Sequence, residues 1–230
     1  MVIVKEAQRL DRSRVVVLIS YWSEHKLYNY AYYLIKKFIP NKFGYIYYRF
    51  SSDLINDDVV LTKNYFNECI TRICADLTPL EAEKKDLYIY GQSLGGLFAM
   101  IIIDKIKIKR AVLICPGDNL AESLWNGSET QDIKNEYMKK GITLNHLKEL
   151  WSDISPDYYF KNKSRFAEFY IKLSNKDTII PTSNGVSLLD LMKERGIKFN
   201  LLHTSLPHKL ALLWECIWPK SSFEFLTKDY

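Results

Sequence analysis

The sequence lacks the patterns that metal centres, disulfide frameworks and nucleotide sites require. Its four cysteines form no CxxC pair, and its four histidines have no metal-ligand spacing. Neither the GxxxxGKS/T phosphate loop nor the GxGxxG dinucleotide fingerprint occurs. We therefore expect no metal and no organic cofactor, and we expect the cysteines to be small buried thiols.

Long apolar segments are missing as well. No run approaches the roughly 20 apolar residues that span a bilayer, and no basic segment leads into an apolar run with a cleavage site at the N-terminus. The sequence therefore predicts no membrane span and a location in the cytoplasm. Cysteines kept as thiols agree with that reducing compartment.

Positive charge is not gathered in the way that nucleic-acid binding favours. The net charge of +5 comes from 32 basic and 27 acidic residues that are mixed along the chain. The densest basic stretch, residues 105–110, alternates with isoleucine and lacks interleaved aromatic residues. We expect no nucleic acid as a partner, and the sequence leaves the oligomeric state open.

What the sequence does contain is a globular α/β pattern. Its 230 residues are 47% hydrophobic and 14% aromatic, which excludes disorder and allows one domain with a large core. We expect strands at residues 15–19, 45–50, 87–90, 111–115, 168–173 and 199–202, a weaker edge strand at 2–4, and helices at about 27–38, 60–77, 97–106 and 183–195. Short strands that alternate with helices predict an α/β fold with a mostly parallel sheet and helices on both of its faces.

One segment breaks this alternation. Residues 118–165 contain no good strand, only helical patterns at about 130–140 and 143–151. An insertion of this size exceeds what a connection needs, and it leaves the edge of the sheet where ligands bind in such folds. We therefore expect a core of residues 1–117 and 166–230 and a small helical lid insertion of residues 118–165. Its aromatic residues suggest an apolar substrate group or a small core of the lid itself: Trp125, Tyr137, Trp151, Tyr158 and Tyr159.

The strongest chemical signal is the pentapeptide Gly91-Gln92-Ser93-Leu94-Gly95, which fits G-x-S-x-G. Alone the pattern is weak, but here an apolar strand precedes it and a helix follows it, as a nucleophile elbow requires. The serine must project from a strained turn, and glycine at the flanking positions removes side chains that would collide there. The pattern indicates Ser93 as a nucleophile.

A serine hydroxyl needs a base, and a histidine base needs an orienting carboxylate. Among the histidines we favour His208, which follows the last predicted strand, over His203 at the end of that strand. Among the carboxylates we favour Asp177, which follows the strand at 168–173, over Asp118 after the preceding strand. Either acid keeps the chain order serine, acid, histidine. His25 and His146 are expected to lie at the surface.

These three positions and their strand context resemble the α/β-hydrolase family over nearly the whole chain. The resemblance implies that Ser93 is the nucleophile, His208 the general base and acid, and Asp177 the acid that orients the histidine. It also implies an oxyanion hole made of backbone N–H groups, one from Leu94 and one from Tyr21.

The loop that would supply the second oxyanion donor departs from the family pattern. Many members carry His-Gly where this chain has Ile19-Ser20, which puts the choice between Tyr21 and its neighbour Trp22 in doubt. The resemblance implies a serine hydrolase that transfers the acyl group of a small-molecule substrate to water, with a carboxylic ester as the leading substrate. Thioesters, amides and peptides are alternatives on the same three residues, and so is a non-catalytic binding protein that kept the fold.

Overall fold

The computed structural model describes residues 3–22, 34–162 and 167–228. In this part of the chain seven strands form one sheet in the order β1-β3-β2-β4-β5-β6-β7, and only β1 runs antiparallel to its neighbour. The strands are β1 (Ile3–Gln8), β2 (Arg14–Ile19), β3 (Gly44–Phe50), β4 (Asp86–Gln92), β5 (Arg110–Ile114), β6 (Glu168–Lys176) and β7 (Phe199–Pro207). The predicted mostly parallel sheet is confirmed.

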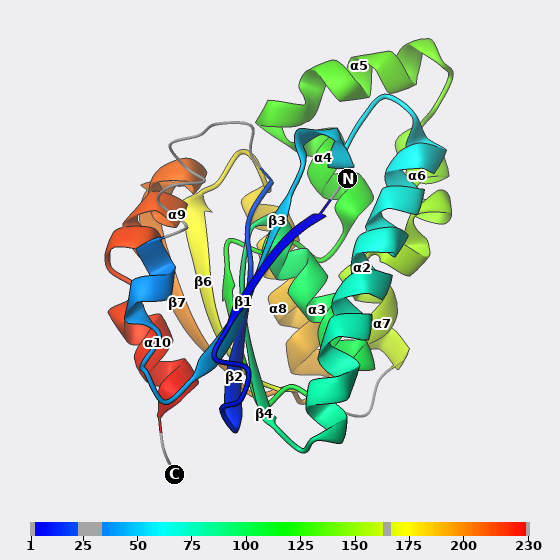
Figure 1. Cartoon of the computed structure of the whole chain (residues 1–230). Coiled ribbons are helices and arrows are strands. Elements are labelled where there is room, and N and C mark those ends of the chain that lie inside the picture. Colours follow the sequence, from blue (N-terminus) through cyan, green and yellow to red (C-terminus); the bar gives the residue numbers. More distant parts are fainter. Residues whose placement is uncertain (1–2, 23–33, 163–166, 229–230) are drawn as a thin grey trace.

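Helices cover both faces of this sheet (Figure 1). They are α2 (Val59–Ala82), α3 (Leu94–Lys105), α4 (Leu120–Asn126), α5 (Gln131–Lys139), α6 (Leu144–Leu150), α7 (Pro156–Asn162), α8 (Thr182–Glu194), α9 (His208–Ile217) and α10 (Lys220–Thr227), with 3₁₀ turns η1 (Ile35–Phe38), η2 (Ser52–Leu54), η3 (Ser128–Thr130) and η4 (Ser152–Ile154). The helix predicted at 27–38 falls mostly on residues 23–33, which lie outside the described ranges. Among the described helices, none combines the length and apolar character that crossing a bilayer requires.

The alternation of side chains along the central strands creates two cores. In β2, Val15, Val17 and Ile19 face one core, while Val16 and Leu18 face the other. The first core contains side chains of α2, α3 and α8, and the second contains side chains of α9 and α10. A strand buried on both faces must be apolar at every position, which is why the β-branched run at 15–19 identified it.

The order of the strands determines where a ligand can bind. β3 lies on one side of β2 and β4 lies on the other, so the connections change direction at β2. Helix connections leaving in opposite directions open a crevice at the carboxyl ends of the strands beside this point. The turn that contains Ser93 follows β4 directly, and Tyr21 comes two residues after β2 ends.

Two predicted helix boundaries were wrong. α2 continues past Pro79 to Ala82, because the proline lies in the last turn on the exposed side, where water can satisfy the carbonyl that loses its partner. α3 begins at Leu94 and not at 97, because Ser93 alone makes the turn and its carbonyl accepts the N–H groups of Gly96 and Leu97.

The described part of the segment between β5 and β6, residues 115–162 and 167, contains four α-helices where the sequence indicated two. Asn119 caps α4 by accepting the N–H of Glu122 at 3.0 Å, and Pro156 opens α7 at the helix position where proline is tolerated. Two aromatic residues of the segment are fully buried in the main core. The Tyr137 hydroxyl donates a hydrogen bond to the carbonyl of Asn56, just before α2, and the Trp151 indole donates one to the carbonyl of Val59, the first residue of α2. Both hydrogen bonds attach the segment to the start of α2.

A buried ion pair attaches α9 to β6. The Lys172 ammonium contacts the Glu215 carboxylate, which also accepts the hydroxyl of Ser222 in α10. Burial raises the pKa of Glu215, while the adjacent ammonium opposes the shift. Because α9 begins at His208 and β6 ends one residue before Asp177, this pair joins the two elements that carry those residues.

We expect Glu215→Gln to lower the free energy of unfolding by about 3–5 kcal/mol, since it leaves a buried ammonium without its counter-charge. The double variant Lys172→Met/Glu215→Leu should recover most of that loss, because an apolar pair of similar volume removes both desolvation penalties. Urea unfolding followed by circular dichroism measures both. A single variant as stable as the wild type would contradict this account of the pair.

Candidate active site

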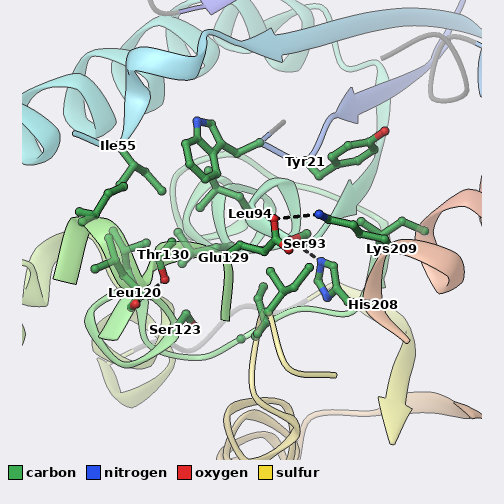
Figure 2. Close-up of a pocket in the computed structure, with 18 of the residues that line it drawn as sticks. Tyr21, Ile55, Ser93, Leu94, Leu120, Ser123, Glu129, Thr130, His208 and Lys209 are labelled. Atoms are coloured by element: carbon green, nitrogen blue, oxygen red, sulfur yellow. Dashed lines mark hydrogen bonds and ion pairs between the residues drawn. The ribbon is translucent and has the colours of Figure 1, made fainter. Parts of the chain in front are cut away.

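A cavity of about 460 Å³ lies at the carboxyl ends of β2 and β4 (Figure 2). Its wall comes from six parts of the chain: the loop after β2, the approach to α2, the turn between β4 and α3 with the start of that helix, the segment between β5 and β6, the loop after β6, and the first turns of α9. It is lined by Tyr21, Trp22, Ile55, Ser93, Leu94, Leu97, Gly117, Leu120, Ser123, Leu124, Glu129, Thr130, Asp132, Ile133, Ile179, Ile180, His208, Lys209 and Leu212. Its size is that of small-molecule sites.

Ser93 sits between β4 and α3 with a backbone that non-glycine residues rarely adopt. Its φ is 52° and its ψ is −120°, and its N–H donates to the carbonyl of Ile114 at 2.7 Å. A Cβ on Gly91 would lie 2.4 Å from the carbonyl oxygen of Gly95, so the tight turn excludes any side chain there. This geometry directs the Ser93 hydroxyl into the cavity, as a nucleophile elbow does.

His208 is the first residue of α9 and follows β7 without a loop. The sequence indicated that β7 ends at 202, but the strand continues to Pro207 and brings the histidine to the sheet edge. Its side chain is buried, and its Nε2 lies 2.9 Å from Ser93 Oγ. The two side chains come from positions 115 residues apart and share one hydrogen bond.

Asp177 follows β6 directly and is buried beside the histidine. Its Oδ2 lies 2.5 Å from His208 Nδ1. Its Oδ1 accepts the backbone N–H groups of Ile179 and Ile180 at 3.0 and 2.9 Å, which fixes the plane of the carboxylate. The structure thus joins Ser93, His208 and Asp177 into one continuous chain of hydrogen bonds.

Tyr21 and Leu94 line the same cavity as Ser93. The loop after β2 lies against the elbow, because a Cβ on Gly95 would come within 2.2 Å of the Ile19 carbonyl oxygen and 2.6 Å of that of Ser20. Only glycine allows this approach. The indole N–H of Trp22, the alternative to Tyr21, donates to the carbonyl of Ser52 at 3.0 Å and anchors the loop on its far side.

The other candidates from the sequence lie elsewhere. His203 is exposed and pairs with the Asn175 side chain at 2.8 Å, and His146 is exposed on α6. His25 lies outside the described residues. The Asp118 carboxylate accepts the hydroxyl of Ser187 in α8 and not a histidine, and burial raises its pKa to about 6.

Sequence reasoning missed an ion pair at the cavity wall. Glu129 Oε2 and Lys209 Nζ are 2.8 Å apart, and both side chains are about half exposed. Figure 2 shows the pair meeting beside Ser93, with the glutamate coming from η3 and the lysine from the start of α9. The position of Lys209 directly after His208 was the one signal available in the sequence.

Within the described ranges, one group of side chains has the spacing of a metal site: Cys115, Asp177 and His208, whose ligand atoms lie within 4.8 Å of one another. Burial raises the pKa of the Cys115 thiol above its usual range, which disfavours the thiolate that binds metals. Both carboxylate oxygens of Asp177 and both ring nitrogens of His208 already have partners. The group therefore does not fit a metal.

No protein-family model matches this sequence, and no curated protein does. The solved structures give a clear likeness at low identity. Esterase B from Lactobacillus rhamnosis has a TM-score of 0.62 at 14% identity, over 97% of this chain and 83% of that chain. The acylaminoacyl peptidase of Pyrococcus horikoshii has a TM-score of 0.64 at 16% identity, over 95% of this chain and 38% of the peptidase.

A third similar structure is the capsule O-acetyltransferase of Neisseria meningitidis serogroup A, with a TM-score of 0.63 at 14% identity over 92% of this chain and 86% of that chain. The three proteins share an architecture and differ in the activity that their names state. At such identities the likeness concerns the fold. It extends over at least 92% of this chain in each of the three comparisons. This chain has the α/β-hydrolase fold.

Proposed function

We propose that this protein is a serine hydrolase in which Ser93 is the nucleophile, His208 the general base and acid, and Asp177 the orienting acid. The observation that carries the proposal is the hydrogen-bonded chain from Asp177 through His208 to Ser93 at the wall of a cavity. A buried Ser-His-Asp chain at a strained strand-to-helix turn is the arrangement that activates a serine hydroxyl.

In the first step His208 Nε2 accepts the Ser93 hydroxyl proton as Oγ attacks the acyl carbon of the substrate. Asp177 accepts the Nδ1–H of the ring, holds the required tautomer and stabilises the imidazolium that forms. We assign the backbone N–H groups of Leu94 and Tyr21 to the oxyanion, because both residues line the cavity and the loop that holds Tyr21 lies against the elbow. Losing one such donor costs roughly 100- to 1,000-fold in rate.

In the second half of the reaction the imidazolium of His208 gives its proton to the leaving group. Water enters, His208 Nε2 accepts one of its protons, and the resulting hydroxide attacks the acyl carbon bound to Ser93. The acid leaves and Ser93 recovers its proton. The residues of this chain perform every proton transfer in this scheme.

The leading substrate is a carboxylic ester with an aliphatic acyl group. The cavity lining is rich in leucine and isoleucine, with nine such residues beside Ser93 and His208: Ile55, Leu94, Leu97, Leu120, Leu124, Ile133, Ile179, Ile180 and Leu212. None of the six aromatic residues of the segment 118–165 lines it. Thioesters, amides and peptides could react by the same steps, and similar folds occur in an esterase, a peptidase and an O-acetyltransferase.

We also propose that residues 118–165 act as the lid of this site, on a core formed by residues 1–117 and 166–230. The segment supplies Leu120, Leu124, Thr130 and Ile133 to one side of the cavity. Its buried aromatics attach it to the main core. In this proposal the lid stays in place and shapes the pocket by forming one of its walls.

A fluorophosphonate probe tests the nucleophile. We expect covalent labelling of the wild type at Ser93, identified by peptide mass spectrometry, and no labelling of Ser93→Ala. Ser123→Ala is the matched control, because Ser123 lines the same cavity but donates its hydroxyl to the Asn119 carbonyl, so labelling at Ser93 should persist. Folded wild-type protein that stays unlabelled would instead favour a non-catalytic binding protein.

The orienting acid is tested by Asp177→Asn, which keeps the acceptor for the N–H groups of Ile179 and Ile180 but loses the charge beside His208. We expect kcat for p-nitrophenyl butyrate to fall about 10⁴-fold while the melting temperature changes little. Asp118→Asn is the control, since its carboxylate contacts Ser187, and it should hydrolyse the ester at close to the wild-type rate. Equal losses in the two variants would refute the assignment of Asp177.

The acyl group is tested by a series of p-nitrophenyl esters from acetate to laurate. A cavity of this size should give the highest kcat/KM at about four to eight acyl carbons and a decline for longer chains. Ile133 lines the cavity and is half-buried. The larger side chain of Ile133→Trp should move the optimum to shorter acyl chains and leave acetate hydrolysis unchanged. Rates that rise steadily to laurate would contradict an acyl pocket bounded by these residues.

A further inference from the structure

β7 is an open edge of the sheet. It spans nine residues and pairs only with β6, and no other described element pairs with its outer side. Most of its residues are exposed, including Leu201 and Leu202, whose side chains point to opposite faces of the sheet. Residues 199–207 include no aspartate, glutamate, lysine or arginine. Proteins normally protect such an edge with charge or cover it, because unpaired N–H and C=O groups invite another strand.

The helix that follows this strand exposes an apolar stripe. Leu210, Trp214, Ile217 and Trp218 recur at the spacing of one helix face, and the two tryptophans are 56% and 62% exposed. The opposite face of α9 is buried against the sheet. α9 packs on β6 and β7, so the stripe and the open edge belong to the same end of the sheet.

We propose that a second copy of this chain binds at this end of the sheet, with β7 of one subunit antiparallel to β7 of the other across a two-fold axis. The sheet then continues through both subunits, and the α9 stripes pack beside the junction. A two-fold axis perpendicular to the sheet places identical edge strands antiparallel, which is the arrangement that pairs their free N–H and C=O groups, and it puts both α9 helices on the same face of the joined sheet.

The area available meets the lower limit for a specific dimer. The four stripe residues and the one exposed leucine of β7 that faces the α9 side together offer on the order of 500 Å² of apolar surface per subunit, which exceeds what single scattered residues present. Two such surfaces bury on the order of 1,000 Å², the lower limit of specific interfaces. The backbone hydrogen bonds of the joined strands would add to this.

The lack of charge in β7 and its free backbone groups favour a second copy of the chain over a lipid bilayer as the partner. In self-pairing, a charged residue near the middle of β7 would face the same charge on its partner, and β7 has none. A bilayer could accept the tryptophans of α9, but it cannot satisfy the free N–H and C=O groups of an open strand. A partner of identical sequence satisfies both the stripe and the edge.

Sedimentation velocity from sub-micromolar to tens of micromolar protein tests the proposal. The wild type should shift with concentration from the 27.0 kDa of one chain to twice that mass. Leu202→Lys, at the edge strand, and Trp214→Glu, on the stripe, should each weaken the dimer at least tenfold. Both residues are exposed, so circular dichroism should show unchanged folding.

Val60→Glu is the matched control, because Val60 is 53% exposed on α2, at the other face of the sheet, and its variant should dimerise like the wild type. A wild type that stays monomeric at every concentration, or a dimer that neither variant weakens, overturns the proposal. Co-sedimentation of a monomeric wild type with phosphatidylcholine–phosphatidylglycerol vesicles, lost in Trp214→Glu, would instead identify the stripe as a membrane contact. None of these outcomes depends on the hydrolase activity.

Discussion

The strained turn at Ser93 is the constraint on which the site depends. A non-glycine residue in this backbone conformation costs on the order of 1–3 kcal/mol and persists only where its surroundings enforce it. Hydrogen bonds hold the Ser93 backbone in place: its N–H donates to a carbonyl of β5, and its carbonyl accepts two N–H groups of α3. The carbonyls beside Gly91 and Gly95 leave no room for a side chain at either glycine. The strained conformation is therefore maintained by β5 and α3, whose residues are almost all buried.

Helix α9 contacts the proposed nucleophile, the segment between β5 and β6, and strand β6. Its first residue, His208, contacts Ser93, and the next, Lys209, contacts Glu129 of the segment between β5 and β6. About two turns after His208, Glu215 is buried against Lys172 of β6 and Ser222 of α10, and these contacts hold the helix against the sheet. A small displacement of α9 would change the distance from His208 to the proposed nucleophile. The buried pair therefore fixes the proposed base at the cost of desolvating two charges.

The part of the chain that would recognise a substrate differs from the part that would perform the chemistry. Ser93, His208 and Asp177 follow strands β4, β7 and β6, where parallel strands bring their carboxyl ends together. Much of the remaining wall comes from the segment between β5 and β6, including Glu129, whose ion pair with Lys209 lies beside Ser93. Connecting segments of this kind tolerate change while the elements of the core remain.

The sequence by itself determined the order of strands and helices, the position of the strained turn, and which histidine and aspartate follow the right strands. Local sterics and hydrophobic periodicity decide these features, and parallel pairing then brings Asp177 and His208 to one edge. Only the tertiary structure decided that Trp151 of the insertion belongs to the main core, that Glu129 reaches Lys209 across 80 residues, and that β7 leaves an open edge beside the exposed face of α9. Contacts of this kind depend on the packing angles between elements that are distant in the chain. Those angles cannot be inferred from residues that are neighbours in the sequence.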